Sequence, residues 1–95
     1  MNPTVTLNDK PRFELGRVVA TAAVMALDVN LSPFIGAHAR GDWGDVMPDD
    51  RQANEDALRE GGRLFSTYTL ANGQKLWVIT EEDRSATTVL LPDDY

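Results

Sequence analysis

The stretch RLFSTYTLANGQKLWVIT, residues 63–80, decides the fold, because two strand-like segments flank the turn dipeptide Asn72-Gly73. β-branched and aromatic residues dominate both segments, as is typical of β-strands. Asn-Gly favours a two-residue type I′ hairpin turn, which needs a positive φ at both central residues. We therefore predict an antiparallel hairpin with strands over residues 63–70 and 74–80.

A two-residue turn determines which side chains of this hairpin lie across from one another. It places Tyr68 opposite Trp77 and Ser66 opposite Ile79, on one face of the sheet. If that face is open, its aromatic side chains form a patch that suits a partner. If helices pack on it, the same residues belong to the core, and the sequence leaves these alternatives open.

Periodicity and capping residues predict the elements outside the hairpin. Thr21 and Ser32 are favoured helix N-caps, and a left-handed Asn30 closes the first helix. The predicted elements are a strand over 13–20, helices over 22–28, over 32–40 and from Pro48 to the Gly61-Gly62 pair, and a last strand over 86–91. The order β-α-α-α-β-β-β predicts an α+β fold, with a small antiparallel four-stranded sheet and helices packed on one side.

The length of 95 residues fits one domain, which we place at 12–95 behind a flexible N-terminal arm over 1–11. The chain has no cysteine, which excludes disulfides, thiol catalysis and cysteine-based zinc sites. No apolar run approaches the roughly 20 residues that span a bilayer. The polar N-terminus lacks the apolar core of a secretory signal, so we expect a cytoplasmic protein.

The net charge of −6 is unevenly distributed along the chain. Residues 42–95 carry twelve acidic and five basic side chains, whereas residues 1–41 carry three and four. Phosphate backbones repel acidic proteins, so nucleic acid is not an expected ligand. The acids serve solubility, meet a partner with a basic surface, or mimic nucleic acid to regulate DNA-acting machinery.

The side chains that carry chemistry form no complete catalytic motif. His38 is the only histidine, and with Asp42 and Asp45 it offers metal ligands for a small hydrolase. Their spacing across a helix end imposes no ligand geometry, so a structural histidine is the competing interpretation. Ser66 lacks the GxSxG context of a nucleophile. No glycine-rich phosphate loop is present, and no cofactor is expected.

Four residues are candidates for binding a partner: Trp43, Tyr68, Trp77 and Arg84. They are the aromatic and arginine residues of the sheet, the GDWGD loop and the EEDRS loop that are candidates for the surface. Arg84 lies in a charged connection, where it either pairs with a neighbouring acid or presents its guanidinium to an anionic group.

Three stretches carry a resemblance to a known family: FELGRVVAT, GDWGD and WVITEEDRSATTVLLPDDY. Together the chain resembles, over residues 13–95, a family of small bacterial proteins described as plasmid-related or genomic-island proteins. The long C-terminal stretch is specific, whereas FELGRVVAT alone is a weak signal. The resemblance implies a bacterial mobile-element setting and brings no activity, cofactor or catalytic residue.

These observations favour a small, non-enzymatic protein-interaction module with an unknown protein partner. The alternatives are the metal-dependent hydrolase at His38, Asp42 and Asp45, and the acidic regulator that mimics nucleic acid. No feature of the sequence indicates self-association or a membrane, so we expect a monomer.

Overall fold

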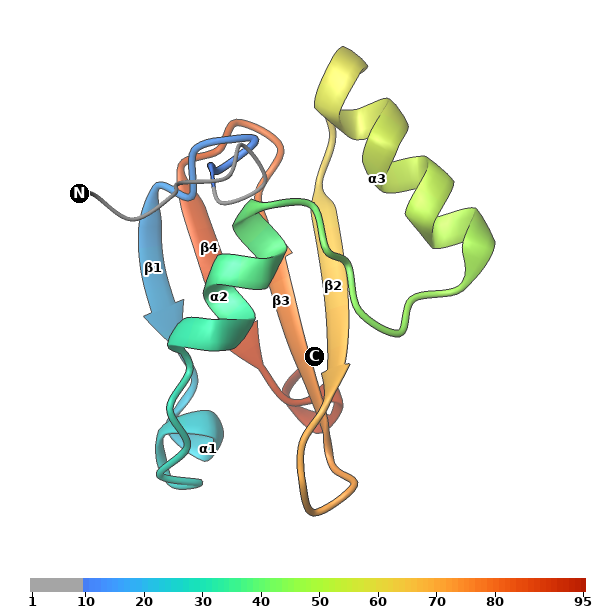
Figure 1. Ribbon diagram of the computed structural model, residues 1–95. Helices are drawn as coiled ribbons and strands as arrows, with labels where there is room; N and C mark the ends of the chain where they lie inside the picture. Colours follow the sequence, from blue (N-terminus) through green and yellow to red (C-terminus); the bar gives the residue numbers. More distant parts are fainter. Residues whose placement is uncertain (1–9) are drawn as a thin grey trace, which may run out of the picture.

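The structure, a computed structural model, describes residues 10–95 (Figure 1). It confirms the α+β class and adds a C-terminal 3-10 helix, η2, that the sequence did not predict. The elements in chain order are β1 (Arg17–Ala20), α1 (Ala22–Met25), α2 (Ser32–Ala39), α3 (Pro48–Glu60), β2 (Leu64–Thr69), β3 (Lys75–Thr80), β4 (Ala86–Leu90) and η2 (Pro92–Asp94).

The four-stranded sheet is mixed, so the prediction of a purely antiparallel sheet is wrong. Its order is β1-β4-β3-β2, with β1 parallel to β4 and the other neighbours antiparallel. The short connections of β2, β3 and β4 require antiparallel pairing. β1 is joined to β2 through three helices, and a connection of that length allows either direction.

The hairpin turns at Ala71-Asn72-Gly73, a three-residue loop instead of the predicted two-residue turn. Leu70 and Gln74 close the loop through the Leu70 N–H, which donates to the Gln74 carbonyl at 2.8 Å. Gly73 has a φ of +86°, whereas Asn72 is not in the left-handed region. The Asn72 side chain instead accepts from the Gln74 N–H at 2.9 Å. Only one residue of this loop therefore needs a positive φ.

The longer loop shifts the register by one residue and separates Tyr68 from Trp77. Tyr68 pairs with Leu76, and Trp77 pairs with Thr67. The two rings therefore lie on opposite faces of the sheet, because side chains alternate along a strand. The observed register buries Leu64, Tyr68, Leu76 and Val78 on one face. The two-residue turn would divide these residues between the two faces, and their joint burial outweighs the local preference of Asn-Gly.

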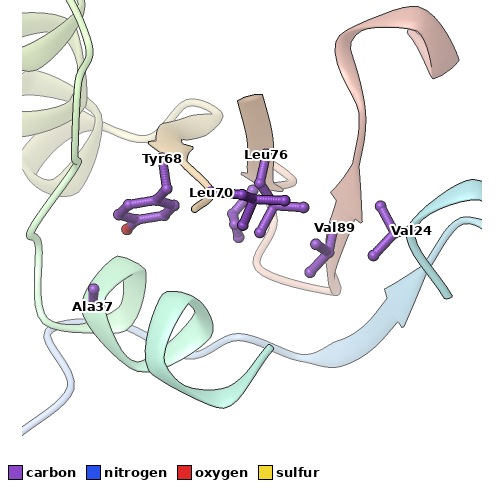
Figure 2. Packing of buried hydrophobic residues seen from close by; sticks show 7 residues of the cluster. Val24, Ala37, Tyr68, Leu70, Leu76 and Val89 are labelled. Atoms are coloured by element: carbon purple, nitrogen blue, oxygen red, sulfur yellow. The ribbon is translucent and has the colours of Figure 1, made fainter. Parts of the chain in front are cut away.

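The core lies between the sheet and the helices α1 and α2. Figure 2 shows the buried side chains of β2, β3 and β4 directed toward Val24 of α1 and Ala37 of α2. The members of this cluster are Val24, Ala37, Tyr68, Leu70, Leu76, Val78 and Val89. We call this side of the sheet the helix-covered face.

The helix α3 lies beside β2, not over a face, which corrects the prediction that all helices pack on one side (Figure 1). A second cluster joins α3 to β2 and to the loop before α3, and consists of Trp43, Val46, Ala57 and Leu64. Gly44 forms a parallel bridge with Thr67 at the same edge. A Cβ at Gly44, which has a φ of +74°, would collide with the Thr67 carbonyl, so this contact requires glycine.

The helix ends agree with the sequence in part. Thr21 caps α1 as predicted, since its hydroxyl accepts from the Val24 N–H at 3.3 Å. The left-handed residue after α1 is Asp28, at φ +54°, and not Asn30. Ser32 is the first residue of α2 while Leu31 holds the cap position. β1 begins at Arg17 instead of Phe13.

The prediction of a flexible arm over 1–11 falls mostly outside the described residues, which begin at residue 10. In the described part of the chain, no helix has both the length and the apolar character needed to cross a bilayer.

Candidate functional site

The face of the sheet opposite α1 and α2 carries a mixture of apolar, hydroxyl and basic side chains. We call it the helix-free face, because no helix of the described chain lies over its centre (Figure 1). The strand pairing assigns to it the apolar residues Val19, Phe65, Trp77, Ile79 and Leu90, the threonines Thr67, Thr69 and Thr88, and the basic residues Arg17 and Lys75.

Three aromatic rings, from Phe65, Trp77 and Tyr95, form a contiguous group on the helix-free face. The Phe65 and Trp77 ring centroids are 5.1 Å apart, and those of Trp77 and Tyr95 are 5.7 Å apart, both in edge-to-face arrangements. The η2 turn directs the chain back toward β3, which brings Tyr95 to Trp77. Tyr95 is 73% exposed, so this aromatic group ends at the solvent.

Arg63 extends the aromatic group with a positive charge. Its Nη1 donates to the Tyr95 hydroxyl oxygen at 3.1 Å, and its Cζ lies 5.9 Å from the Tyr95 ring centroid. Its Nε lies 3.6 Å from a carboxylate oxygen of Glu81. These contacts place the guanidinium beside the exposed Tyr95 ring.

The helix-free face is poor in acids although the whole chain has a net charge of −6. The only charged residues in the four strands are Arg17 and Lys75, and both are basic. Lys75 has an acidic neighbour, Asp45, at 3.8 Å. This part of the surface is thus apolar and weakly basic, in contrast to the acidic helix α3 and the loop at 81–83.

Trp43, the first predicted binding residue, lies in the core with a side chain that is 1% exposed. Its ring stacks on Phe13 at 6.1 Å, and its Nε1 donates to Glu55 at 3.0 Å. Arg12 donates to both carboxylate oxygens of the same Glu55, and these two partners lower the pKa of Glu55. In this conformation Trp43 offers no surface to a partner.

Tyr68, the second predicted residue, is 8% exposed and lies on the helix-covered face. Its hydroxyl donates to the Asp42 carbonyl at 2.6 Å, and its ring packs against Phe34 of α2 at 5.5 Å. Burial raises the pKa of Tyr68 to about 12. Of the pair Tyr68 and Trp77, only Trp77 belongs to the helix-free face.

Arg84, the last predicted binding residue, uses its guanidinium to bind backbone carbonyls of its own chain. Its guanidinium donates to the carbonyls of Gly62 at 2.6 Å and of Ala57 at 3.1 Å, and to two carbonyls of its own loop. Ala57 lies in the last turn of α3, and its carbonyl also accepts from the Gly61 N–H at 2.9 Å. The negative end of the helix dipole attracts a cation at this position. Arg84 therefore joins the β3–β4 loop to the end of α3.

His38 belongs to a buried hydrogen-bond chain whose direction determines its tautomer. The Thr87 hydroxyl donates to the Leu15 carbonyl at 2.7 Å, so it must accept from the Thr80 hydroxyl. The Thr80 oxygen then accepts from His38 Nε2–H at 2.8 Å. His38 Nδ1 is left to accept from the Ser66 hydroxyl at 2.6 Å.

The protonation of His38 follows from this burial. Its side chain is 0% exposed, and desolvation lowers its pKa from 6.5 to about 4. Ser66 is also fully buried, so this serine–histidine pair has no access to a substrate. The geometry supports the structural interpretation of His38 that the sequence left open.

The predicted metal ligands do not come together. Both ring nitrogens of His38 already have hydroxyl partners. Asp42 caps the turn at Gly44, and Asp45 accepts from the Thr69 hydroxyl at 2.7 Å. Among residues 10–95, no group of three or more histidine and acidic side chains is arranged to hold a metal ion.

The acids required for mimicry of nucleic acid lie at two separate places. Arg84 brings the loop with Glu81, Glu82 and Asp83 to the end of α3, whereas Asp49 and Asp50 lie in its first turn, roughly 15 Å away along the axis. The acids between them are partly paired: Glu55 with Arg12, and Asp56 with Arg59. The two groups therefore do not join into one acidic face.

Sequence reasoning missed Phe65, Tyr95 and Arg63 as parts of one surface. Alternation places Arg63 and Phe65 on one side of their strand, but only the register relates them to Trp77, and the Asn-Gly turn indicated a register one residue away. Tyr95 has no such signal, since it reaches Trp77 only through the unpredicted η2 turn.

Comparison with protein-family models, with curated proteins and with solved structures gives no match for this chain.

Proposed function

We propose that this chain is a small, non-enzymatic protein-interaction module that binds a protein partner through its helix-free face. The observation that supports this proposal most strongly is the group of Phe65, Trp77 and Tyr95, with Arg63 held beside the exposed ring. Tryptophan, tyrosine and arginine supply most of the binding energy at protein interfaces, above all where they cluster.

The surroundings of the aromatic group fit an interface. Between the aromatic group and Val19, which is 40% exposed, lie Ile79 and Leu90, each 6% exposed. Arg17 and Lys75 lie at the margin of this surface. An apolar centre with polar and charged residues around it is the usual anatomy of a protein-protein interface. A partner with an apolar patch and a few carboxylates at its rim complements this face.

The burial of the catalytic candidates supports a role without chemistry. His38 and Ser66 are 0% exposed, and their polar atoms are used within the chain of hydroxyls. A cytoplasmic location and the bacterial mobile-element setting implied by the resemblance are part of the same proposal.

Photocrosslinking in the native cell tests this proposal. A photoreactive phenylalanine analogue at Thr88, in the centre of the helix-free face, is expected to capture a protein. The same analogue at Gln52, exposed on α3, is the matched control and is expected to capture none. Crosslinking from Gln52 and not from Thr88 would place the interface on α3 and overturn the proposal.

A binding measurement with the captured protein completes the test. We expect Tyr95→Ala to weaken binding by about tenfold or more, because the ring is the most exposed member of the aromatic group. Gln52→Ala should bind as the unmodified chain does. Tyr95 contributes little to the core, so its loss leaves the fold intact; equal affinity of both variants would exclude the aromatic group as the contact.

A further inference from the structure

The two edges of the sheet differ in whether their backbone groups are paired. At the β2 edge, the Asn54 side chain donates to the Phe65 carbonyl at 2.7 Å and accepts from the Phe65 N–H at 3.0 Å. One step along, the Thr67 N–H donates to Trp43 at 3.2 Å, and the Thr67 carbonyl accepts from Asp45 at 2.7 Å. This edge is closed to a further strand.

The β1 edge carries outward backbone groups that no other described residue bonds. The Arg17 N–H donates to Ser85 and the Thr21 N–H to Val89, each at 3.0 Å, so the alternate residues Val18 and Ala20 direct their N–H and C=O groups away from β4. Within residues 10–95, no strand lies beyond β1 (Figure 1). Val18 is 43% exposed, so its side chain does not block access to this edge.

We propose that β1 pairs antiparallel with β1 of a second copy of this chain across a twofold axis. In this arrangement Val18 lies opposite Ala20 of the second copy, and Val19 lies opposite its own counterpart. The outward N–H and C=O groups of Val18 and Ala20 then form four hydrogen bonds across the axis. A twofold interface uses the same patch on both copies, so it closes after two and joins two sheets into one of eight strands.

Charge complementarity favours a second copy of the chain as the partner of the β1 edge. It also favours the register that places Val18 opposite Ala20. Arg17 lies across from Thr21 of the second copy at a non-hydrogen-bonded position, where side chains come closest. The Thr21 hydroxyl donates to the Asp94 carboxylate at 2.7 Å, which fixes an acid at that point. Each Arg17, which has no ion pair within residues 10–95, then meets an Asp94 carboxylate, twice by symmetry. Pairing Val18 with its own counterpart would put Arg17 across from Val19 instead.

The interface is small, which sets the expected strength. A four-residue strand buries far less than the roughly 1,200–2,000 Å² of a stable interface. We therefore expect a dissociation constant in the range of about 10 µM to 1 mM. This inference does not rest on the proposed function, because self-association is measured with no other partner present.

Sedimentation equilibrium of the full chain, from about 10 µM to 1 mM, tests the proposal. The expected result is a reversible shift from monomer to dimer with no larger species. Arg17→Asp should weaken dimerisation by about tenfold, since it places like charges together twice. Lys75→Asp, the matched control, changes a basic residue of the same face far from β1 and should dimerise as the unmodified chain does.

Two further variants keep the result interpretable. Val18→Pro removes an outward N–H without touching the bonds between β1 and β4, and should abolish the dimer. Mixing Arg17→Asp with Asp94→Arg pairs opposite charges at both positions and should give a mixed dimer that is tighter than the dimer of either variant alone. A monomer throughout the range, open-ended association, or equal behaviour of Arg17→Asp and Lys75→Asp would overturn the proposal.

Discussion

The two faces of the sheet differ in the burial and hydrogen bonding of their hydroxyl groups. On the helix-covered face, Ser66, Thr80 and Thr87 are 0% exposed, and each hydroxyl has a partner in the chain of bonds through His38. On the helix-free face, Thr67 and Thr88 are partly exposed, and Thr67 pairs with Trp77. A fully paired polar interior specifies one packing, whereas an accessible mixed surface is available to a partner. The same strands thus supply both the stability and the proposed contact.

The largest expected effect is a difference in stability between matched positions on the two faces. Leu76→Ala leaves a cavity at a side chain that is 0% exposed, and should lower the free energy of unfolding by roughly 2–5 kcal/mol. Thr88→Ala, on the helix-free face, should lower it by less than about 1 kcal/mol. Urea unfolding followed by circular dichroism measures both. Equal losses would mean that both faces are interior.

The pH dependence of stability reports on His38. Its pKa of about 4 in the folded chain lies below the ordinary value of 6.5, so between these pH values only the unfolded chain binds the proton. The stabilisation is therefore fully present above pH 6.5 and is lost as the pH falls toward 4, by on the order of 3 kcal/mol.

The ring signals of His38 test this directly, because it is the only histidine. We expect them to stay in the neutral form down to about pH 5. A midpoint near 6.5 would show that the ring reaches solvent and that the hydroxyl chain is open. Unfolding of His38→Gln at the same pH values measures how much of the pH dependence of stability comes from the carboxyl groups instead of His38.

The capped edge of β2 gives a smaller effect. Asn54→Ala leaves the partly buried Phe65 N–H and C=O without a partner, and should lower the free energy of unfolding by roughly 1–3 kcal/mol. Gln52→Ala, two residues away on the exposed side of α3, should change it by less than about 0.5 kcal/mol. Unfolding curves of the two variants, measured together, distinguish an edge cap from a general effect of changing α3.

The smallest effect distinguishes the observed loop from the predicted turn. Gly73→Ala should destabilise by about 1 kcal/mol, because alanine is strained at a φ of +86°. Asn72→Gly should also destabilise slightly, since it removes the bond to the Gln74 N–H and frees the unfolded chain. In a type I′ turn Asn72 would have a positive φ, and glycine there would be neutral or stabilising. A stabilising Asn72→Gly would therefore contradict the observed register.

The sequence predicted the elements of this fold better than their relations in space. The hairpin, the Thr21 cap and the helix from Pro48 to Glu60 depend on neighbouring residues, and all three are present. The parallel pairing of β1 with β4 depends on residues about 70 positions apart, which no local pattern encodes. The register depends on which side chains are buried together in the core, and this burial outweighs the turn preference of Asn-Gly.

The candidate site was predictable only in part for the same reason. Residue type indicated Trp77, which does lie on the helix-free face. The same criterion also indicated Trp43 and Arg84, because an aromatic ring or a guanidinium serves a core or a loop as readily as an interface. Tyr95 joins the site through a backbone turn whose position only the folded sheet defines.

The most direct test of the difference between the faces uses the two tryptophans separately. Trp43→Phe leaves Trp77 as the only tryptophan, and Trp77→Phe leaves Trp43. Acrylamide should quench the fluorescence of Trp77 several-fold more strongly than that of Trp43, because Trp43 is 1% exposed and Trp77 lies on the helix-free face. Equal protection of both rings would show that the helix-free face is covered, and would contradict the existence of an open aromatic surface.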